Sequence, residues 1–450
     1  MQFPDGAIKT TPQSVNKVSL HWAAPPKVAL VVRKPNDLEV KDKFVEAVRL
    51  LKERGIKIFV EPAVIADALQ AGSVMPPPAP SASASVPAGT EPPPDAYQTS
   101  PRGGAGSFQR RASSDATGAV NRLPADVMAV LNTYDADEAP TLHERIDFTV
   151  ALGGDGTLLW AANLFPHSSV PPIVAFAMGS LGFLTPFDIS EMAKQIDRTI
   201  QGDFELTLRS RLTCQVVRHE DRRRLRSVLG SKRRRRSDAG TGAALPIPTL
   251  QQLHEWREKQ AEGDMEPELV RSALNEICVS RPPDGSIVDV DVHVDGVRVT
   301  KLLADGLLLA TPTGSTAYSM SAGGSMVHPA VPCMLFTPIC PHSLSARPMA
   351  FPDSSTLAIE VADTARCEAV ALFDGKQAVT LRRGDAIVVE ISTQPVPTVA
   401  GLGESEDWFE VVTGLLMWNQ RAAQKPWQPP EDEDADADGD AASAGAAAEG

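Results

Sequence analysis

The segment "FTVALGGDGTLLWAANLF", residues 148–165, determines how the first half of the chain folds. Its opening residues are almost continuously apolar, which is typical of a strand buried on both faces of a parallel sheet. Three glycines and an aspartate follow at once, and a mostly apolar stretch comes after them. The segment therefore predicts a strand, a tight glycine turn and a helix. The N-terminus of such a helix attracts phosphate groups.

The same alternation of strands and helices continues on both sides of this segment. One helical face carries Val40, Phe44, Val48 and Leu51, with apolar β-branched runs before and after it. The expected elements are strands at 27–32, 56–62 and 171–177 and helices at 36–55, near 124–133 and at 189–202. Strand, amphipathic helix and strand form the βαβ unit of a parallel sheet. We therefore expect an α/β domain with a doubly wound sheet over residues 27–205.

The hydrophobic period changes near residue 206. Stretches such as "SIVDVDVHVDGVRVT" (286–300) and "STLAIEVAD" (355–363) alternate apolar and polar residues, and Asp-Gly turns lie between such stretches. This pattern predicts antiparallel sheet, so residues 206–400 are expected to form a β-rich domain. The stretch 404–420 is expected to be helical and to pack back on the body, within a C-terminal segment 401–425.

Four further segments lie outside these two domains or interrupt them. They are an N-terminal extension (1–26), a Pro/Ser-rich insertion (71–118), a basic insertion (219–265) and an acidic Ala-rich tail (426–450). Segments of such composition bury too little surface to offset the entropy of ordering, so we expect the insertion 71–118 and the tail to be disordered.

Composition excludes several classes of protein. The 450 residues carry a net charge of −14, which argues against a general nucleic-acid or membrane binder. No apolar run approaches the roughly 18 residues of a membrane helix, and no leader peptide is visible at the start of the sequence. The five cysteines form no CxxC pair, which favours reduced thiols over a disulfide framework or a zinc site. A cytoplasmic protein is the expectation, with an organelle left open.

The glycine turn at Gly153–Gly156 carries the first chemical signal. Its backbone N–H groups favour phosphate, whereas the carboxylate of Asp155 repels it. A carboxylate at Asp155 is explained if it accepts the proton of a hydroxyl that attacks a phosphoryl group. The alternative is a plain tight turn, since Asp-Gly is a common turn dipeptide.

A hydroxyl-rich segment at residues 305–325, "DGLLLATPTGSTAYSMSAGGS", carries the second signal. From Thr311 onward it holds many Ser and Thr hydroxyls and no charged residue, which is typical of a loop that cradles a polar ligand. Tyr318 and Ala317 could pack on an aromatic ring. A polar turn between strands is the alternative.

Two weaker signals remain open. Asn275 and Glu276 begin an apolar strand and could bind a ribose diol or an adenine amino group, although these two residues alone are better explained by a strand end exposed to water. Asp374 in "LFDGK" is typical of a hairpin turn and could also line a site. The arginine runs at 222–226 and 233–236 lack interleaved aromatic residues, so a solvated loop is expected there rather than a nucleic-acid site.

Taken together, these motifs resemble those of the ATP-dependent NAD kinases, and the eukaryotic branch in particular. The resemblance covers residues 27–70, 120–218 and 270–425. The motifs that carry it, in chain order, are "LGGDGTLLWAA", "GSLGFLTPF", "RSRL", "LNEICVSR", "DGLLLATPTGSTAYSMSAGG", "TPICPHSLSARP" and "FDGK". The glycine–aspartate motif also occurs in phosphofructokinases and in diacylglycerol and sphingosine kinases, whereas the segment 305–324 with Asn275–Glu276 is specific to NAD kinases.

The resemblance implies a Rossmann-like N-terminal domain, a β-sandwich-like C-terminal domain and an active site between them. It implies transfer of the γ-phosphate of ATP to the 2′-hydroxyl of the adenosine ribose of NAD, with Mg²⁺ or another divalent cation, in a homo-oligomer. By motif, Asp155 matches the general base, and Gly153, Gly154 and Thr157 match residues that hold the ATP phosphates. Contacts to NAD are implied for Gly156, Asn275, Glu276, Asp305, Thr313, Gly314, Ser315, Thr316, Ala317, Tyr318, Ser321 and Asp374.

Two other functions compete with this interpretation. A lipid kinase of the diacylglycerol type would share the glycine turn but has no use for the hydroxyl-rich segment. A catalytically silent NAD(H)-binding regulator would keep that segment and lose the acid, whereas Asp155 is present.

Overall fold

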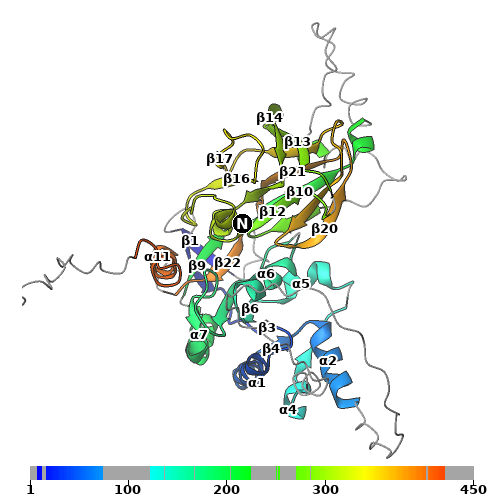
Figure 1. Ribbon diagram of the computed structural model, residues 1–450. Coiled ribbons are helices and arrows are strands. Elements are labelled where there is room, and N and C mark those ends of the chain that lie inside the picture. Colours follow the sequence, from blue (N-terminus) through cyan, green and yellow to red (C-terminus); the bar gives the residue numbers. More distant parts are fainter. Residues whose placement is uncertain are drawn as a thin grey trace, which may run out of the picture.

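The computed structural model describes residues 8–12, 17–73, 122–135, 137–166, 168–202, 204–223, 250, 252–253, 270–283, 285–401 and 404–420. These residues form an α/β part on one ten-stranded sheet and a sandwich of two six-stranded antiparallel sheets. Figure 1 shows the sandwich above the α/β part, with one helix, α6, close to the junction of the two.

The parallel half of the large sheet carries the predicted doubly wound arrangement. Its strands, in spatial order, are β5 (Leu131–Asn132), β4 (Lys57–Phe59), β3 (Val28–Arg33), β6 (Phe148–Leu152) and β7 (Ile173–Ala177). Helices α1 (Leu38–Glu53) and α7 (Met192–Gln201) pack on one face, and α5 (Leu142–Arg145) and α6 (Asp155–Asn163) pack on the other. Every residue of β6 and β7 is buried, because both faces of these strands are covered.

Strands from distant parts of the chain extend the same sheet. They are β22 (Val396–Val399), β9 (Phe204–Arg209), β2 (Lys17–Trp22) and β1 (Ile8–Pro12), while the short strand β8 (Phe187–Asp188) pairs with β7. Strand β22 pairs in parallel with β7 and antiparallel with β9. Residues from the expected N-terminal extension and from the range 206–400 thus contribute strands to the first sheet.

The sandwich confirms the alternating pattern of the second half. One sheet consists of β11 (Val270–Ala273), β10 (Leu212–Val217), β21 (Ala386–Ile391), β18 (Leu357–Val361), β13 (Val288–Val294) and β14 (Val297–Ala304). The other consists of β17 (Met349–Pro352), β16 (Cys333–Ile339), β15 (Gly306–Ala310), β12 (Glu276–Ser280), β19 (Ala369–Phe373) and β20 (Lys376–Leu381). Residues from both sheets form one apolar core.

Two local expectations need correction. The helix expected near 124–133 is a single turn, α4 (Ala125–Met128), because Leu131 and Asn132 pair with β4 as an edge strand. A helix that was not expected, α2 (Pro62–Ser73), continues into the first residues of the insertion 71–118. The rest of that insertion, most of the second one and the tail lie outside the described residues.

The start of the basic insertion is not a solvated loop. Residues 219–223 are helical, and Arg222 is only 1% exposed. Its guanidinium donates to the carbonyl oxygen of Gly384 at 2.8 Å and forms an ion pair with Glu360 at 2.6 Å. A buried cation needs such partners. The expectation of solvated arginines was therefore wrong for Arg222.

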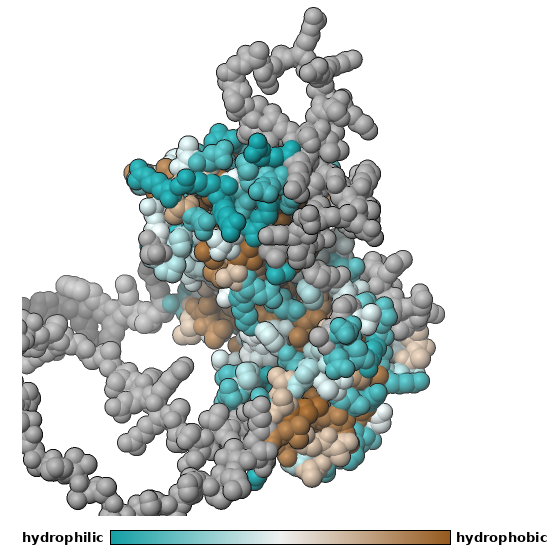
Figure 2. Space-filling view, turned by 90° about the vertical axis from the view of Figure 1, so that its right-hand side faces the viewer, coloured by the Kyte–Doolittle hydropathy of each residue, from teal (hydrophilic) through white to brown (hydrophobic). Residues whose placement is uncertain are grey.

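Two general expectations can be compared with the described residues. All five cysteines are free. None of the described helices is long and apolar enough to cross a membrane. On the face of the molecule drawn in Figure 2, hydrophilic residues cover the upper end and an apolar patch lies near the lower end.

Candidate functional site

The glycine turn joins the carboxyl end of β6 to the N-terminus of α6. The N–H of Gly153 donates to the carbonyl oxygen of Phe176 on β7 at 3.1 Å, which holds the turn to the sheet. Gly154 is the N-cap, and Asp155 is the first residue of the helix. Leu158 and Ala161 are buried against the sheet, so α6 presents its N-terminus at the carboxyl edge of the strands.

The carboxylate of Asp155 binds the backbone of the loop at 181–186. Its Oδ2 accepts from the N–H of Phe183 at 3.1 Å, and its Oδ1 accepts from the N–H of Leu184 at 3.0 Å and from Thr185 Oγ1 at 3.4 Å. A Cβ at Gly182 would collide with this carboxylate, so the loop requires glycine there. Asp155 is half-buried, and its position is determined by three donors.

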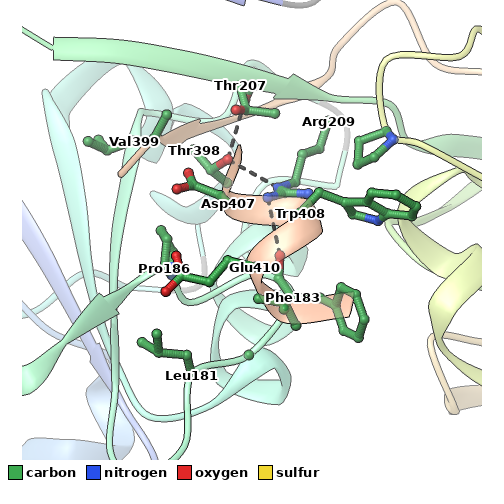
Figure 3. Close-up of a pocket in the computed structure, with 14 residues that line it drawn as sticks. Leu181, Phe183, Pro186, Thr207, Arg209, Thr398, Val399, Asp407, Trp408 and Glu410 are labelled. Carbon is green, nitrogen blue, oxygen red and sulfur yellow. Dashed lines mark hydrogen bonds between the residues drawn. The ribbon is translucent and has the colours of Figure 1, made fainter. Parts of the chain in front are cut away.

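Arg209 on β9 holds the same loop from its other side. Figure 3 shows its guanidinium between the hydroxyl of Thr398 on β22, at 3.1 Å, and the carbonyl oxygen of Phe183, at 3.3 Å. Helix α11 (Glu404–Gly414), which lies in the stretch expected to be helical, covers this contact with Asp407 and Trp408. The antiparallel half of the sheet thus positions Phe183, which in turn donates to Asp155.

Asp374 forms the expected hairpin turn between β19 and β20, with a φ of 47°. Its carboxylate accepts from the N–H groups of Leu274, Asn275 and Glu276 at 2.9, 2.8 and 3.2 Å. Asn163, the last residue of α6, also hydrogen-bonds to it. Burial raises the pKa of Asp374, and the hydrogen bonds oppose that rise.

Glu276 lies beside Asp374 at the start of β12 and is 8% exposed. Burial, together with the charge of Asp374, raises the pKa of Glu276 to about 7. The backbone N–H of Tyr318 donates to its carboxylate, whereas Oε2 has no hydrogen-bond partner among the described residues. A buried carboxylate oxygen without a partner is costly, and a hydroxyl of a bound ligand would satisfy it.

The hydroxyl-rich segment is more helical than expected. Strand β15 leads into a 3₁₀ turn (Thr313–Thr316) and one turn of α-helix, α10 (Tyr318–Ser321). The hydroxyl of Thr311 donates to the carbonyl oxygen of Leu274 at 2.6 Å and accepts from the N–H of Gly314 at 3.0 Å. A Cβ at Gly314 would collide with the backbone of Asn275, so the two segments are in direct contact.

The predicted ligand residues of this segment divide into two groups. Ser315 is buried and bonds both backbone groups of Val327, and Thr316 donates to the carbonyl oxygen of Thr313, so these hydroxyls hold the loop itself. Tyr318 and Ser321 are exposed, and Ala317 is partly exposed. Asp305 is partly exposed and pairs with Arg281 at 3.0 Å. Ala317, Tyr318 and Ser321 are therefore the residues of this segment that have exposed surface for contact with a ligand.

Helix α6 connects the two groups of candidate residues. Leu274 packs into the same core as Leu158 and Ala161, which places the start of β12 against the helix. Asp155 and Asn163 are the two ends of α6, about 12 Å apart along its axis. Asp155 is therefore at one end of the helix, and the acidic pair Glu276 and Asp374 is at the other.

A cavity lies beside the glycine turn. Gly154, Gly156 and Thr157 line a cavity of about 590 Å³, while Gly153 is buried beneath the turn. Sequence reasoning missed the other polar residues of this cavity: Arg33, Lys34, Glu61, Asp67, Trp160 and Lys376. The available signal was that Arg33 and Lys34 directly follow a buried strand, where ligands bind in α/β sheets.

Comparison with known proteins identifies the family. A family model described as the ATP-NAD kinase N-terminal domain matches residues 28–204, and one described as the ATP-NAD kinase C-terminal domain matches residues 274–401. A rice protein (Oryza sativa subsp. japonica) named "Putative NAD kinase 3" is 35% identical over 426 residues, 94% of this chain and 67% of the rice protein. The chain belongs to the ATP-dependent NAD kinase family.

Two further relatives of this NAD kinase family member differ in coverage. NAD kinase 2, chloroplastic, of Arabidopsis thaliana is 39% identical over 300 residues, which are 66% of this chain and 26% of the Arabidopsis protein. The crystal structure of yeast NADH kinase complexed with NADH has a TM-score of 0.64 and 26% identity, and the match covers 94% of this chain and 96% of that chain. The two-part fold is thus similar to that of the solved yeast NADH kinase.

Proposed function

We propose that this chain transfers the γ-phosphate of ATP to the 2′-hydroxyl of the adenosine ribose of NAD and so forms NADP and ADP. The observation that carries the proposal is the position of Asp155 at the N-terminus of α6, between the ATP-phosphate candidates of the glycine turn and the loop at 181–186. An acid placed beside a phosphate-binding helix end suits a reaction in which a hydroxyl attacks a phosphoryl group.

Asp155 has the capacity to act as the base. An ionised carboxylate offers about four lone pairs, and Phe183, Leu184 and Thr185 use three of them, two on Oδ1 and one on Oδ2. The second lone pair of Oδ2 is left for the substrate hydroxyl. The hydroxyl oxygen forms a bond to the γ-phosphorus, the bond from that phosphorus to the β–γ bridging oxygen breaks, and the proton passes to Asp155.

NAD is proposed to bind along α6, with its polar groups at Glu276, Asn275, Tyr318, Ser321 and Asp305. The unpartnered Oε2 of Glu276 supports this placement, because a ribose hydroxyl would satisfy it. Gly314, Ser315 and Asp374 are proposed to act by shaping this wall, since their contacts are to the backbone of Asn275, Val327 and residues 274–276. Contacts to NAD are also proposed for Thr313, Thr316, Ala317 and Gly156.

ATP is proposed to arrive with its divalent cation as part of the substrate. Within the described ranges, no group of three or more His, Cys, Asp or Glu side chains is placed to hold a metal ion. The proposed cation does not require such a group, because Mg²⁺ in phosphoryl-transfer sites is commonly held by one or two carboxylates together with substrate phosphates and water.

One assay tests the proposal. The purified chain is incubated with Mg²⁺-ATP and either NAD or NADH, and the 2′-phosphorylated dinucleotide is measured, with diacylglycerol as the alternative acceptor. We expect phosphorylation of the dinucleotide and none of the lipid. Binding of NAD without any product would favour the silent-regulator alternative instead.

A homo-oligomer is the proposed assembly. Val297 and Val299 on the edge strand β14 are 66% and 52% exposed, and apolar side chains on a sheet edge favour contact with another chain. Light scattering that gives the mass of a monomer at micromolar concentration would contradict this proposal.

A cytoplasmic location is proposed as well. The Arabidopsis relative is named chloroplastic, so an organelle is the competing outcome. Fractionation of cells that express the full chain distinguishes the two.

A further inference from the structure

Helix α11 contacts two loops that belong to different parts of the proposed site. It follows β22 in the chain, and Asp407 Oδ2 accepts from the N–H of Gly401 at 2.9 Å, which anchors the helix near the end of that strand. Val411 is buried, so one side of the helix packs on the body of the protein. The two loops that this helix contacts are those at 181–186 and 326–330.

The first loop, at 181–186, carries the backbone N–H groups that donate to Asp155. Trp408 of α11 and Phe183 of this loop line the same small cavity, which Figure 3 shows. The cavity measures only about 20 Å³, roughly the room of one water molecule, so helix and loop are closely packed. Arg209 lines it as well and donates to the carbonyl oxygen of Phe183 at 3.3 Å. Helix α11 therefore restricts the movement of both the arginine and the loop.

The second loop follows the hydroxyl-rich segment and is tied to it. The N–H of Val327 donates to the hydroxyl of Ser315 at 2.9 Å, and that hydroxyl donates to the carbonyl oxygen of Val327 at 3.2 Å. In the next residue, His328, Nδ1 accepts from the N–H of Ala330 at 3.1 Å, which orients the ring. This ring meets Trp408 edge-on, with ring centres 5.2 Å apart, a favoured geometry for aromatic pairs.

We propose that Trp408 is a positioning residue for the phosphoryl transfer, because it packs against both loops at once. Through the cavity that it shares with Arg209, it keeps the first loop in place around Asp155. Through His328, it keeps the segment 305–325 in place for NAD. The inference rests on the proposed function, which takes Asp155 as the base and that segment as part of the NAD site. It adds that one side chain of α11 couples the chemical step to NAD binding.

Steady-state kinetics of NADP formation at saturating Mg²⁺-ATP separate these two effects. Arg209→Met is expected to lower kcat about tenfold and to leave the KM for NAD within about twofold, because only the loop at Asp155 loses a hydrogen bond. His328→Ala is expected to raise the KM for NAD about fivefold and to leave kcat within about twofold, because only the second loop loses its aromatic contact.

Trp408→Leu is expected to change both parameters, lowering kcat about tenfold and raising the KM for NAD about fivefold. Trp408→Phe keeps a ring against His328, so its KM for NAD is expected to stay within about twofold of the wild-type value. Trp418→Leu removes an exposed tryptophan beyond the end of α11 and is the matched control, with wild-type kcat and KM expected.

Hydrogen exchange measured by mass spectrometry gives a readout that needs no turnover. Because N–H groups of the loop at 181–186 are held by Asp155, the peptide that covers this loop is expected to exchange at least about threefold faster in Trp408→Leu. The peptide that covers the buried strand β6 is expected to exchange at the wild-type rate. Trp418→Leu is expected to match the wild type in both peptides.

Three results would overturn the role of Trp408. They are wild-type kinetics in Trp408→Leu, a lower kcat with unchanged KM and unchanged exchange, and equally faster exchange in the loop and in β6, which indicates general unfolding. The proposed function fails by another measurement, namely a wild-type chain that forms no NADP. The exchange experiment still tests the hold of Trp408 on the loop in that case, so the two failures are distinguishable.

Discussion

The carboxylate of Asp374 accepts a hydrogen bond from the backbone N–H of Glu276, 3.2 Å away. Two acidic side chains therefore lie close together at the start of the buried strand β12. Asp374 satisfies three backbone donors there, and its charge adds to the desolvation of Glu276. The hairpin that carries Asp374 therefore shapes the wall proposed to bind NAD. It also helps to raise the pKa of Glu276 to about 7.

Glu276→Gln is expected to make the unliganded protein more stable at pH 8 than the wild type. The folded-state pKa of Glu276, about 7, is above its ordinary value of 4.5. The neutral acid thus contributes stability that is complete below pH 4.5 and is lost as pH rises through 7. One pKa unit corresponds to about 1.4 kcal/mol, so a shift from 4.5 to about 7 limits the gain at pH 8 to about 3.5 kcal/mol.

Thermal unfolding from pH 5 to pH 8 measures this effect. The exposed Glu53→Gln, at the end of α1, serves as the control. Parallel curves of melting temperature against pH for Glu276→Gln and wild type would show that Glu276 does not titrate in this range.

Asp155→Asn is expected to leave NAD binding largely intact and to reduce NADP formation at least ~100-fold, the usual scale for the loss of a general base. The amide still offers an oxygen to the loop, yet it cannot take up the proton of the attacking hydroxyl. Steady-state product formation and calorimetric NAD binding are the two measurements. Asp188→Asn, which removes a carboxylate that likewise accepts from a backbone N–H, is the control. Full turnover in Asp155→Asn would remove Asp155 from the mechanism.

Arg211→Met is expected to destabilise the fold by about 2–5 kcal/mol. The guanidinium, 2% exposed, donates to the carbonyl oxygens of Gln394, Phe165 and Ser168 at 2.7, 2.8 and 3.1 Å and so links the two parts of the molecule. Methionine would leave these three acceptors unsatisfied in the interior. Denaturant titration gives the free energy of unfolding, and the exposed Arg383→Met is expected to stay within about 0.5 kcal/mol of wild type. A similar small change in Arg211→Met would contradict the proposed link.

Gly314→Ala is expected to cost about 1–3 kcal/mol of stability and to weaken NAD binding. The added methyl group would collide with the backbone of Asn275 and push the 3₁₀ turn away from β12. Gly414→Ala, where a methyl group meets open space, is the control for the loss of glycine itself. The melting temperature and calorimetric NAD affinity are the readouts, and wild-type values for both would show that the two segments separate without cost.

Local chemistry in the sequence was enough for much of this protein. The buried runs at β3, β6 and β7, the helix after the glycine turn and the Asp374 hairpin all follow from hydrophobic period and turn residues, which act over a few neighbours. The same local reasoning placed the helix near 124–133 wrongly, because pairing of Leu131 with Ile58 on β4 overrides helix propensity.

Tertiary structure alone decided which distant residues meet. Three contacts join residues that are far apart in sequence. Strand β22 pairs with β7, Arg209 donates to the loop that binds Asp155, and the ammonium of Lys376 lies over the ring of Trp160. The hydrophobic period of the sequence does not encode such pairings, because they stabilise the protein only once the distant segments have packed together. The sequence by itself determined which groups are available for chemistry, and packing determined which of them face one another.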